Sequence, residues 1–367
     1  MQTPPVPLWE IPLKLSTLYE QYGYARYRMG KFEPYDFYMA NKQFLKGEGV
    51  ITFTDSEGRL MALKPDVTMS IVKNVPEDSG PRKFYYNESV FRSERGDYRE
   101  ISQMGLEYIG GGADWAQTEA VSLAIDTLGA LGAEFSLDIS HMGFISAMLN
   151  SAVADTGGAE TLLACIRQKN LGGLSAAAEK YALSAETRAA LLKAASLRGE
   201  LSAVLPDARL LVLCPEMDAA LDELEALSKA LAVLGKTVNL DFSVINDIDY
   251  YNGLVFRGYV RGAPRSVLSG GRYDNLMRRF GRDMSAVGFA LYLSSLDRAF
   301  YTTGEYDVDV LLIYGGAEPW EVARAVSELS GHGLSVRAEQ TADTDIRARR
   351  TLALGADGTF EEIDGAF

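Results

Sequence analysis

FRSERGDYREISQMGLE, residues 91–107, contains the clearest β pattern of the chain. Alternation of apolar and polar side chains predicts strands at 83–91 and 100–110, separated by a charged loop at 92–99. Side chains of a strand point to opposite faces in turn, so one face carries Ile101, Gln103, Gly105 and Glu107. Because glycine leaves space above a sheet, this face suits a floor that contacts a ligand. The solvated face of an ordinary sheet explains the pattern equally well.

The segments around these two strands predict further strands and helices. In chain order they are a helix at 9–21, a hairpin at 50–63, a helix at 115–131, strands at 237–243 and 253–268, a helix at 273–280 and a long apolar helix at 285–302. Strands of this kind interleaved with helices predict an α+β protein, in which an antiparallel sheet is flanked by helices.

Two regions differ in composition from this core. Residues 145–235 are rich in Ala, Leu and Glu at helical spacing, which predicts a mainly helical insertion. Residues 308–367 read strand, helix, strand, helix, with the last helix at 344–354. We therefore expect three parts: a core of 1–144 and 236–303, an insertion at 145–235, and a small α/β unit at 304–367.

The composition argues against several classes of site. With 36 basic and 50 acidic residues the net charge is −14, which opposes nonspecific nucleic-acid binding. Two cysteines and two histidines are too few for a disulfide framework or a histidine-rich metal site, so we expect a reducing cytoplasm and no metal. There is neither a dinucleotide-binding nor a P-loop glycine motif, no signal peptide is expected, and no apolar run is long enough to span a membrane.

Three more segments bring polar groups to the ends of predicted elements. In LKPDVT (63–68), Asp66 and Thr68 face one side and suit an ammonium group, although Asp66 also suits a helix N-cap. In DYYNGLVF (249–256), the paired tyrosines suit either a ligand or the core. In SGGRYDNL (269–276), a glycine pair before a helix lets the backbone approach a ligand closely.

Taken in order, these four segments resemble the catalytic domain of histidyl-tRNA synthetases over about residues 10–300. KPDVT (64–68) resembles the family's Arg-Pro-Glu-Gly-Thr. Residues 91–107 resemble class II motif 2, with its Phe-Arg-x-Glu and Gln-x-Gly-x-Glu. Residues 249–256 and 270–274 resemble two signatures of the histidine pocket. The resemblance implies a class II synthetase-like fold, in which 304–367 is a truncated counterpart of the anticodon-binding domain.

Carried over position by position, the resemblance implies a site for histidine. Asp66, Thr68 and Gln103 would hold the α-ammonium group. Glu107 and Tyr251 would meet the imidazole, since a carboxylate and a phenol can bond both ring nitrogens. The full set of histidine-binding candidates is Asp66, Thr68, Gln103, Glu107, Tyr250, Tyr251, Gly271 and Tyr273, the last of which would close the pocket.

The departures from the family's pattern fall on the nucleotide side. Arg92 matches the arginine that holds the ATP α-phosphate, and together with Arg99 it is a candidate anion ligand. Asn246 stands where the family has an arginine that stabilises charge during adenylation. Ser295 replaces the motif 3 arginine that grips ATP, and Tyr292 replaces a glycine. The groups that stabilise transition-state charge are therefore missing, and we assign no catalytic residue.

Retained histidine ligands and lost nucleotide ligands together imply a sensor. The family with this pattern comprises regulatory paralogues that assemble with the short-form ATP phosphoribosyltransferase catalytic subunit of histidine biosynthesis. The resemblance implies a cytoplasmic, allosteric hetero-oligomer built on a homodimer, with L-histidine as effector and without cofactor, tRNA or membrane. Two alternatives stay open: a divergent, active histidyl-tRNA synthetase, and another amino-acid-binding paralogue of the synthetase.

Overall fold

The chain divides into two compact units between Arg298 and Ala299. The structure is a computed structural model that describes residues 8–41, 45, 49–76, 80–94, 96–245, 250–300, 306–342 and 345–363. Asn246 and Asp249, which the sequence singled out, lie outside these ranges. Within them, no helix is both long and apolar enough to cross a membrane.

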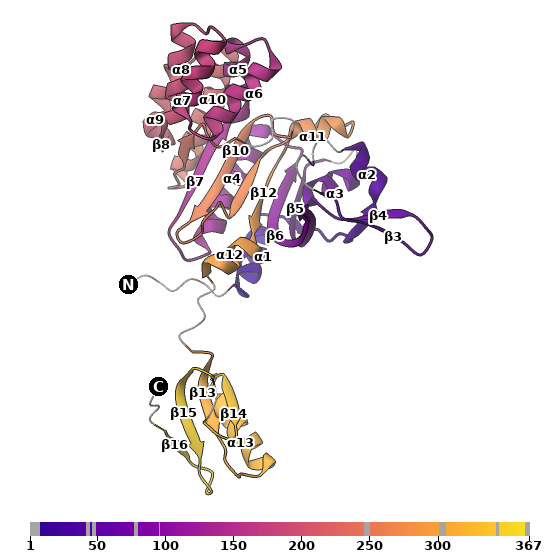
Figure 1. Cartoon of the computed structure of the whole chain (residues 1–367), viewed down its shortest axis with the longest axis vertical. Coiled ribbons are helices and arrows are strands. Elements are labelled where there is room, and N and C mark those ends of the chain that lie inside the picture. Colours follow the sequence, from indigo (N-terminus) through magenta and orange to yellow (C-terminus); the bar gives the residue numbers. More distant parts are fainter. Residues whose placement is uncertain are drawn as a thin grey trace. The chain divides into compact units, whose positions relative to one another are not determined.

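A nine-stranded sheet forms the centre of the first unit (Figure 1). Across the sheet the strands are β1 (Ala25–Arg26), β5 (Arg82–Glu94), β6 (Asp97–Ile109), β12 (Ala286–Tyr292), β11 (Leu268–Arg272), β10 (Leu254–Val260), β7 (Phe135–His141), β9 (Asn239–Asp241) and β8 (Arg198–Glu200). β1 pairs with β5 and β7 with β9 in parallel, and the other neighbours are antiparallel. The predicted α+β class with a mainly antiparallel sheet is thus confirmed.

Two helices, α1 (Ile11–Gln21) and α4 (Ala113–Gly129), cover one face of this sheet. Tyr19 of α1 is fully buried and packs against Phe289 of β12. Helix α4 lies so close to β10 that a Cβ on Gly258 would come within 2.7 Å of Leu128. Because these helices occupy one face, ligand-binding groups of the central strands have only the other face available.

A smaller three-stranded sheet lies beside the N-terminal part of the large one, in the order β2 (Phe32–Pro34), β4 (Leu60–Leu63), β3 (Thr52–Thr54). The short helices of the unit are α2 (Tyr35–Ala40), α3 (Val67–Asn74), α11 (Asp274–Arg279) and α12 (Leu293–Phe300). Helix α3 begins at Asp66 because this carboxylate accepts a 2.8 Å hydrogen bond from the Met69 backbone N–H.

Six helices form a bundle over residues 142–233, and we propose that this bundle is the insertion expected at 145–235 (Figure 1). They are α5 (Met142–Ala152), α6 (Thr156–Arg167), α7 (Leu171–Lys180), α8 (Ala185–Ser196), α9 (Leu201–Arg209) and α10 (Pro215–Val233). Helix α5 packs on β10 and α10 packs on α4. The ion pair Lys169–Asp241 at 2.7 Å also ties this region to the sheet, and within the sheet Arg198 of β8 pairs with Asp138 of β7 at 2.8 Å.

The second unit is a four-stranded sheet with one described helix, α13 (Pro319–Gly331). Its strands lie in the order β14 (Val336–Glu339), β13 (Val308–Ile313), β15 (Ala348–Leu354) and β16 (Phe360–Glu362). The helix predicted at 344–354 is therefore wrong, because β15 occupies most of that segment. It pairs with β13 on one side and β16 on the other, a tertiary context that a helix-compatible composition does not reveal.

Two predictions within the first unit are also wrong. The charged residues 92–99 are mostly strand, since Arg92 pairs with Arg99 and Glu94 with Asp97. Gly96, with φ of +90°, lets the chain reverse at the very tip. The apolar segment at 285–302 begins with β12 and becomes helical only at Leu293. A central strand buried on both faces is continuously apolar, and this pattern alone does not distinguish it from a buried helix.

Candidate functional site

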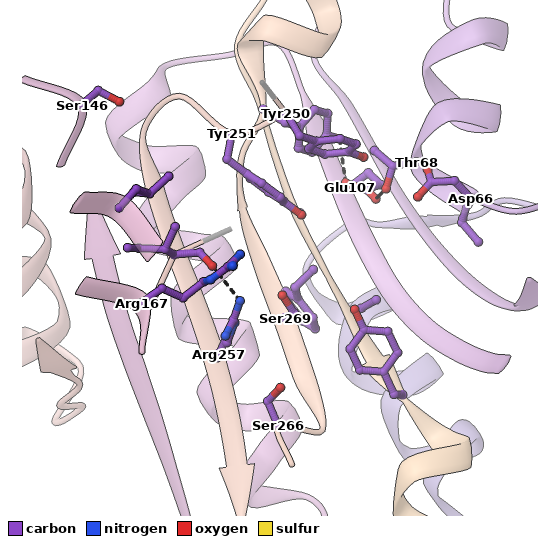
Figure 2. A pocket seen from close by; sticks show the side chains of 18 of the residues that line it. Asp66, Thr68, Glu107, Ser146, Arg167, Tyr250, Tyr251, Arg257, Ser266 and Ser269 are labelled. Atoms are coloured by element: carbon purple, nitrogen blue, oxygen red, sulfur yellow. Dashed lines mark hydrogen bonds between the residues drawn. The ribbon is translucent and has the colours of Figure 1, made fainter. Parts of the chain in front are cut away.

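A cavity of about 1000 Å³ lies on the sheet face that α1 and α4 leave uncovered (Figure 2). Its floor comes from β6, β10, β11 and β12, and one side comes from the start of α3. The opposite side is formed by α5 and α6, where Thr156, Glu160, Leu163 and Arg167 follow helical spacing along one face. The core and the helical bundle therefore both contribute walls to one cavity.

The carboxyl group of Glu107 is the most constrained polar group of the cavity. Only 2% of the residue is exposed. The Thr68 hydroxyl donates to Oε1 and the Tyr273 hydroxyl donates to Oε2, each at 2.6 Å. Burial raises the pKa of Glu107 to about 8 in spite of these two hydrogen bonds, which act in the opposite direction. At neutral pH the carboxyl group is therefore mainly protonated.

Two glycines on adjacent strands make room for this carboxyl group and for Tyr251. Gly288 of β12 pairs with Glu107 on one side and with Gly271 of β11 on the other. A Cβ on Gly288 would overlap the Glu107 carboxyl group. A Cβ on Gly271 would lie 2.8 Å from the Tyr251 ring. The cavity floor at this point is bare backbone, which brings the two side chains down onto the sheet.

Three tyrosines enclose the Glu107 side of the cavity. The ring centroid of Tyr250 lies 4.7 Å from that of Tyr251 and 5.9 Å from that of Tyr273. Burial, reinforced by the nearby Glu107, raises the pKa of all three phenols well above the usual value. Each phenol therefore keeps its proton and can donate a hydrogen bond at any physiological pH.

Asp66 and Arg92 lie together at the edge of the cavity. Asp66 caps α3 through Oδ1, so the N-cap interpretation of this residue describes a real contact. Its Oδ2 lies 3.9 Å from Arg92 Nη2, and Arg92 Nε donates to the Pro65 carbonyl at 3.0 Å. Burial raises the pKa of Asp66, while the Met69 N–H and the Arg92 charge lower it in part.

Most of the residues predicted from the sequence lie around this one cavity. Those that line it are Asp66, Thr68, Arg92, Gln103, Glu107, Tyr250, Tyr251 and Tyr273. Gly271 lies beneath Tyr251. Arg99 instead lines a separate small pocket with Phe91 and Tyr98. Tyr292, noted as a departure from the family's pattern, lines the main cavity as well.

The space above Gly105 is not open to a ligand as the sequence suggested. A Cβ there would come within 2.7 Å of the Tyr86 hydroxyl, and Tyr86 itself lines the cavity. The bare floor lies instead at Gly288. Its role depends on the pairing of β12 with β6, two strands far apart in the sequence, so the local pattern held no signal for it.

Sequence reasoning also missed the basic side of the cavity. Arg167 of α6 and Arg257 of β10 both line it, together with Ser146, Ser266 and Ser269. A signal was present for Arg257, which is the one charged residue in the strand LVFRGYV. Within the described parts of the chain, no three His, Cys, Asp or Glu side chains come together to hold a metal ion.

Comparison with known proteins identifies the family to which the chain belongs. The family model described as histidyl-tRNA synthetase matches residues 9–296. A protein of Geobacillus thermodenitrificans named ATP phosphoribosyltransferase regulatory subunit is 31% identical, over 79% of this chain and 75% of that protein.

Two solved structures share the class II synthetase-like fold. The first, described as an ATP phosphoribosyltransferase regulatory subunit/histidyl-tRNA synthetase from Bacillus halodurans, has a TM-score of 0.77 at 24% identity and covers 96% of both chains. The second is a chain of the ATP phosphoribosyl transferase (HisG:HisZ) complex from Thermotoga maritima, with a TM-score of 0.63 at 18% identity. It covers 77% of this chain and 96% of that one.

Proposed function

Because this chain belongs to the histidyl-tRNA synthetase family, and its relatives are named ATP phosphoribosyltransferase regulatory subunits, we propose that it is such a subunit and senses histidine. In this proposal it makes no product alone. It associates with the catalytic phosphoribosyltransferase chain, activates it, and conveys feedback inhibition by histidine bound in the cavity. A homodimer of this chain forms the core of the assembly.

The histidine proposal rests on the buried carboxyl group of Glu107, which is held by hydrogen bonds from Thr68 and Tyr273. An imidazole ring has one N–H donor and one bare nitrogen when neutral, and two donors when charged. A buried carboxyl group with a pKa of about 8 can donate to the bare nitrogen, and once ionised it can accept from an N–H. The nearby Tyr251 phenol offers a second partner on the same side of the cavity.

Support for a non-catalytic role comes from the nucleotide side of the same region. Arg92, which could contact a phosphate, is engaged with Asp66 and the Pro65 carbonyl. Tyr292 adds an aromatic side chain to the cavity wall. Ser295 has no charge to offer, and neither does Asn246. Without the two arginines, adenylate formation would lack groups that typically contribute about 2.7–4 kcal/mol each.

The test is reconstitution with a short-form ATP phosphoribosyltransferase catalytic subunit. We expect the two chains to copurify, phosphoribosyltransferase activity to rise when this chain is added, and histidine to lower that activity. Histidine-dependent ATP–pyrophosphate exchange by this chain alone would instead identify a working synthetase. Absence of association at micromolar concentrations, with histidine binding intact, would point to an independent amino-acid-binding paralogue.

A further inference from the structure

The cavity has two ends of opposite chemical character. The end that contains Asp66 and Glu107 supplies carboxyl groups and phenols, and its one guanidinium group, that of Arg92, lies beside Asp66. The other end, between β10 and α6, supplies the guanidinium groups of Arg167 and Arg257. Figure 2 shows Tyr251 lying between the Glu107 group and the two arginines. A single cavity with this layout can hold two ligand groups of different charge, one at each end.

The size of the cavity also indicates more than one occupant group. Sites for drug-sized ligands and cofactors range over about 300–1000 Å³, and this cavity of about 1000 Å³ lies at the upper limit. An amino acid with one small ring fills only part of such a volume. The Glu107 end provides enough partners for it, which leaves the arginine end for another group.

The two arginines come from different parts of the fold, yet both face the cavity. Arg257 is half-buried on β10, and its Nη2 donates to the Ile245 carbonyl at 2.8 Å, which fixes the direction of the side chain. Arg167 is exposed at the C-terminal end of α6. Figure 2 shows their guanidinium groups turned toward the same region.

The position of Arg167 has a local explanation that does not extend to Arg257. A cation in the last turn of a helix interacts favourably with the helix dipole, which accounts for an arginine at the end of α6. Arg257 lies in the middle of an apolar strand, where its Nη2 donates to the Ile245 carbonyl while the side chain lines the cavity. Two guanidinium groups directed at one region repel each other, and an anion between them removes that repulsion.

The neighbouring hydroxyl groups favour phosphate among the anions. Ser269 of β11 and Ser266, which precedes β11, lie on the arginine side of the same cavity, whereas Ser146 of α5 lies farther from the two arginines in Figure 2. Together with two guanidinium groups, Ser266 and Ser269 offer donors from several directions, as three phosphate oxygens require. An acidic residue, Glu160, also lines this side of the cavity. It is exposed to solvent and lies two turns before Arg167 on α6.

We propose that the Arg167–Arg257 end of the cavity binds the phosphate group of a phosphorylated small molecule. The guanidinium groups hold the phosphate oxygens, and the serine hydroxyls complete the set of donors. Because Arg167 is exposed, this end is open to solvent and a phosphorylated ligand can enter from it. The proposal concerns residues other than those of the histidine proposal and stands whether or not histidine binds.

Calorimetry with inorganic phosphate, in a phosphate-free chloride buffer, tests the proposal on the full chain. We expect a dissociation constant of about 1 mM or tighter. Arg257→Gln and Arg167→Gln should each weaken binding about ten- to hundredfold. Arg257→Lys should lie between, because an ammonium group keeps the charge but loses the bidentate geometry. Arg261→Gln is the matched control, since this exposed arginine pairs with Glu134 at the surface, and it should leave binding unchanged.

Further measurements separate the proposal from its rivals. Glu107→Gln should leave phosphate binding intact while it weakens histidine binding, so failure of one proposal does not imply failure of the other. Acetate, as the carboxylate probe, should bind more weakly than phosphate. The proposal is overturned if phosphate does not bind, if acetate binds as tightly, or if Arg257→Gln weakens histidine binding and spares phosphate. Arg167→Gln changes an exposed residue, so it provides a readout even if the Arg257 variants fold poorly.

Discussion

The Tyr273 hydroxyl donates a 2.6 Å hydrogen bond to Oε2 of Glu107, a contact between a residue that follows β11 and one near the end of β6. The same carboxyl group accepts from Thr68 through its other oxygen. Both oxygens thus have fixed donors before any ligand arrives. A group held in this way presents its remaining lone pairs and its proton in set directions, which is how a small pocket selects one ring geometry.

Replacement of Glu107 by glutamine should weaken histidine binding. The amide must turn its NH₂ group toward one of the two hydroxyl donors, and it cannot exchange a proton with an imidazole. We expect the dissociation constant for histidine to rise about ten- to hundredfold in calorimetry. Glu100→Gln, at an exposed position of the same strand, is the control and should bind normally. Equal affinities for wild type and Glu107→Gln would remove Glu107 from the site.

The raised pKa of Glu107 should make stability depend on pH. The folded-state pKa of about 8 lies above the ordinary value of 4.5, so the folded chain binds more protons than the unfolded chain between these values. Its free energy of unfolding must therefore fall as the pH rises from about 5 to 8. Glutamine carries no charge, so its stability does not fall in this way. The free energy of unfolding of Glu107→Gln relative to wild type should therefore rise by on the order of 4 kcal/mol between pH 5 and pH 8. Urea unfolding of wild type and Glu107→Gln at pH 5 and pH 8 measures this change. If the stability of the two proteins depended on pH in the same way, Glu107 would not have a raised pKa.

Alanine at position 288 should disrupt the site without adding any polar change. The new methyl group would overlap the Glu107 carboxyl group and push it away from Thr68 and Tyr273. We expect the free energy of unfolding to fall by about 1–3 kcal/mol and histidine binding to be lost. Gly80→Ala, where an added Cβ meets no atom within 4 Å, should change stability by less than about 0.5 kcal/mol. Wild-type affinity in Gly288→Ala would show that the carboxyl position is not critical.

Lys64 should be essential to the stability of the segment that leads to Asp66. Its side chain is fully buried and pairs with Glu88 at 3.0 Å. Burial lowers the pKa of Lys64, and Glu88 opposes this shift. Lys64→Met leaves Glu88 without its partner and should cost about 3 kcal/mol in chemical denaturation. Lys64→Met combined with Glu88→Gln should recover part of that loss, and a double variant as unstable as the single would contradict a charge effect.

Local pattern predicted the residues of the site better than it predicted their surroundings. Alternation along β6 placed Gln103 and Glu107 on one face, and both line the cavity. The turn that contains Asp66 begins a helix in the structure, as its cap chemistry suggested. These inferences worked because they depend on neighbours within a few residues.

The errors at 285–302 and 344–354 share one cause, which is that a strand paired with each segment lies far away in the sequence. β12 was predicted as helix because the partners that make it a strand, β6 and β11, are not adjacent in the sequence. The same pairing gives Gly288 its importance. The sequence around Arg257 does not predict its place in the site, because Arg167, which lines the same end of the cavity, comes from α6. Strand order and the placement of the helical bundle have no local signature.

The mixed origin of the cavity walls has a mechanical consequence. The sheet supplies the floor, while α5 and α6 of the bundle supply one side, so an occupant touches both at once. Anything that shifts these helices against the sheet changes the fit of the occupant. By reciprocity, the occupant biases the position of the helices by the same free energy. An occupant that contacts both the sheet and these helices is therefore energetically coupled to how α5 and α6 are placed on the sheet.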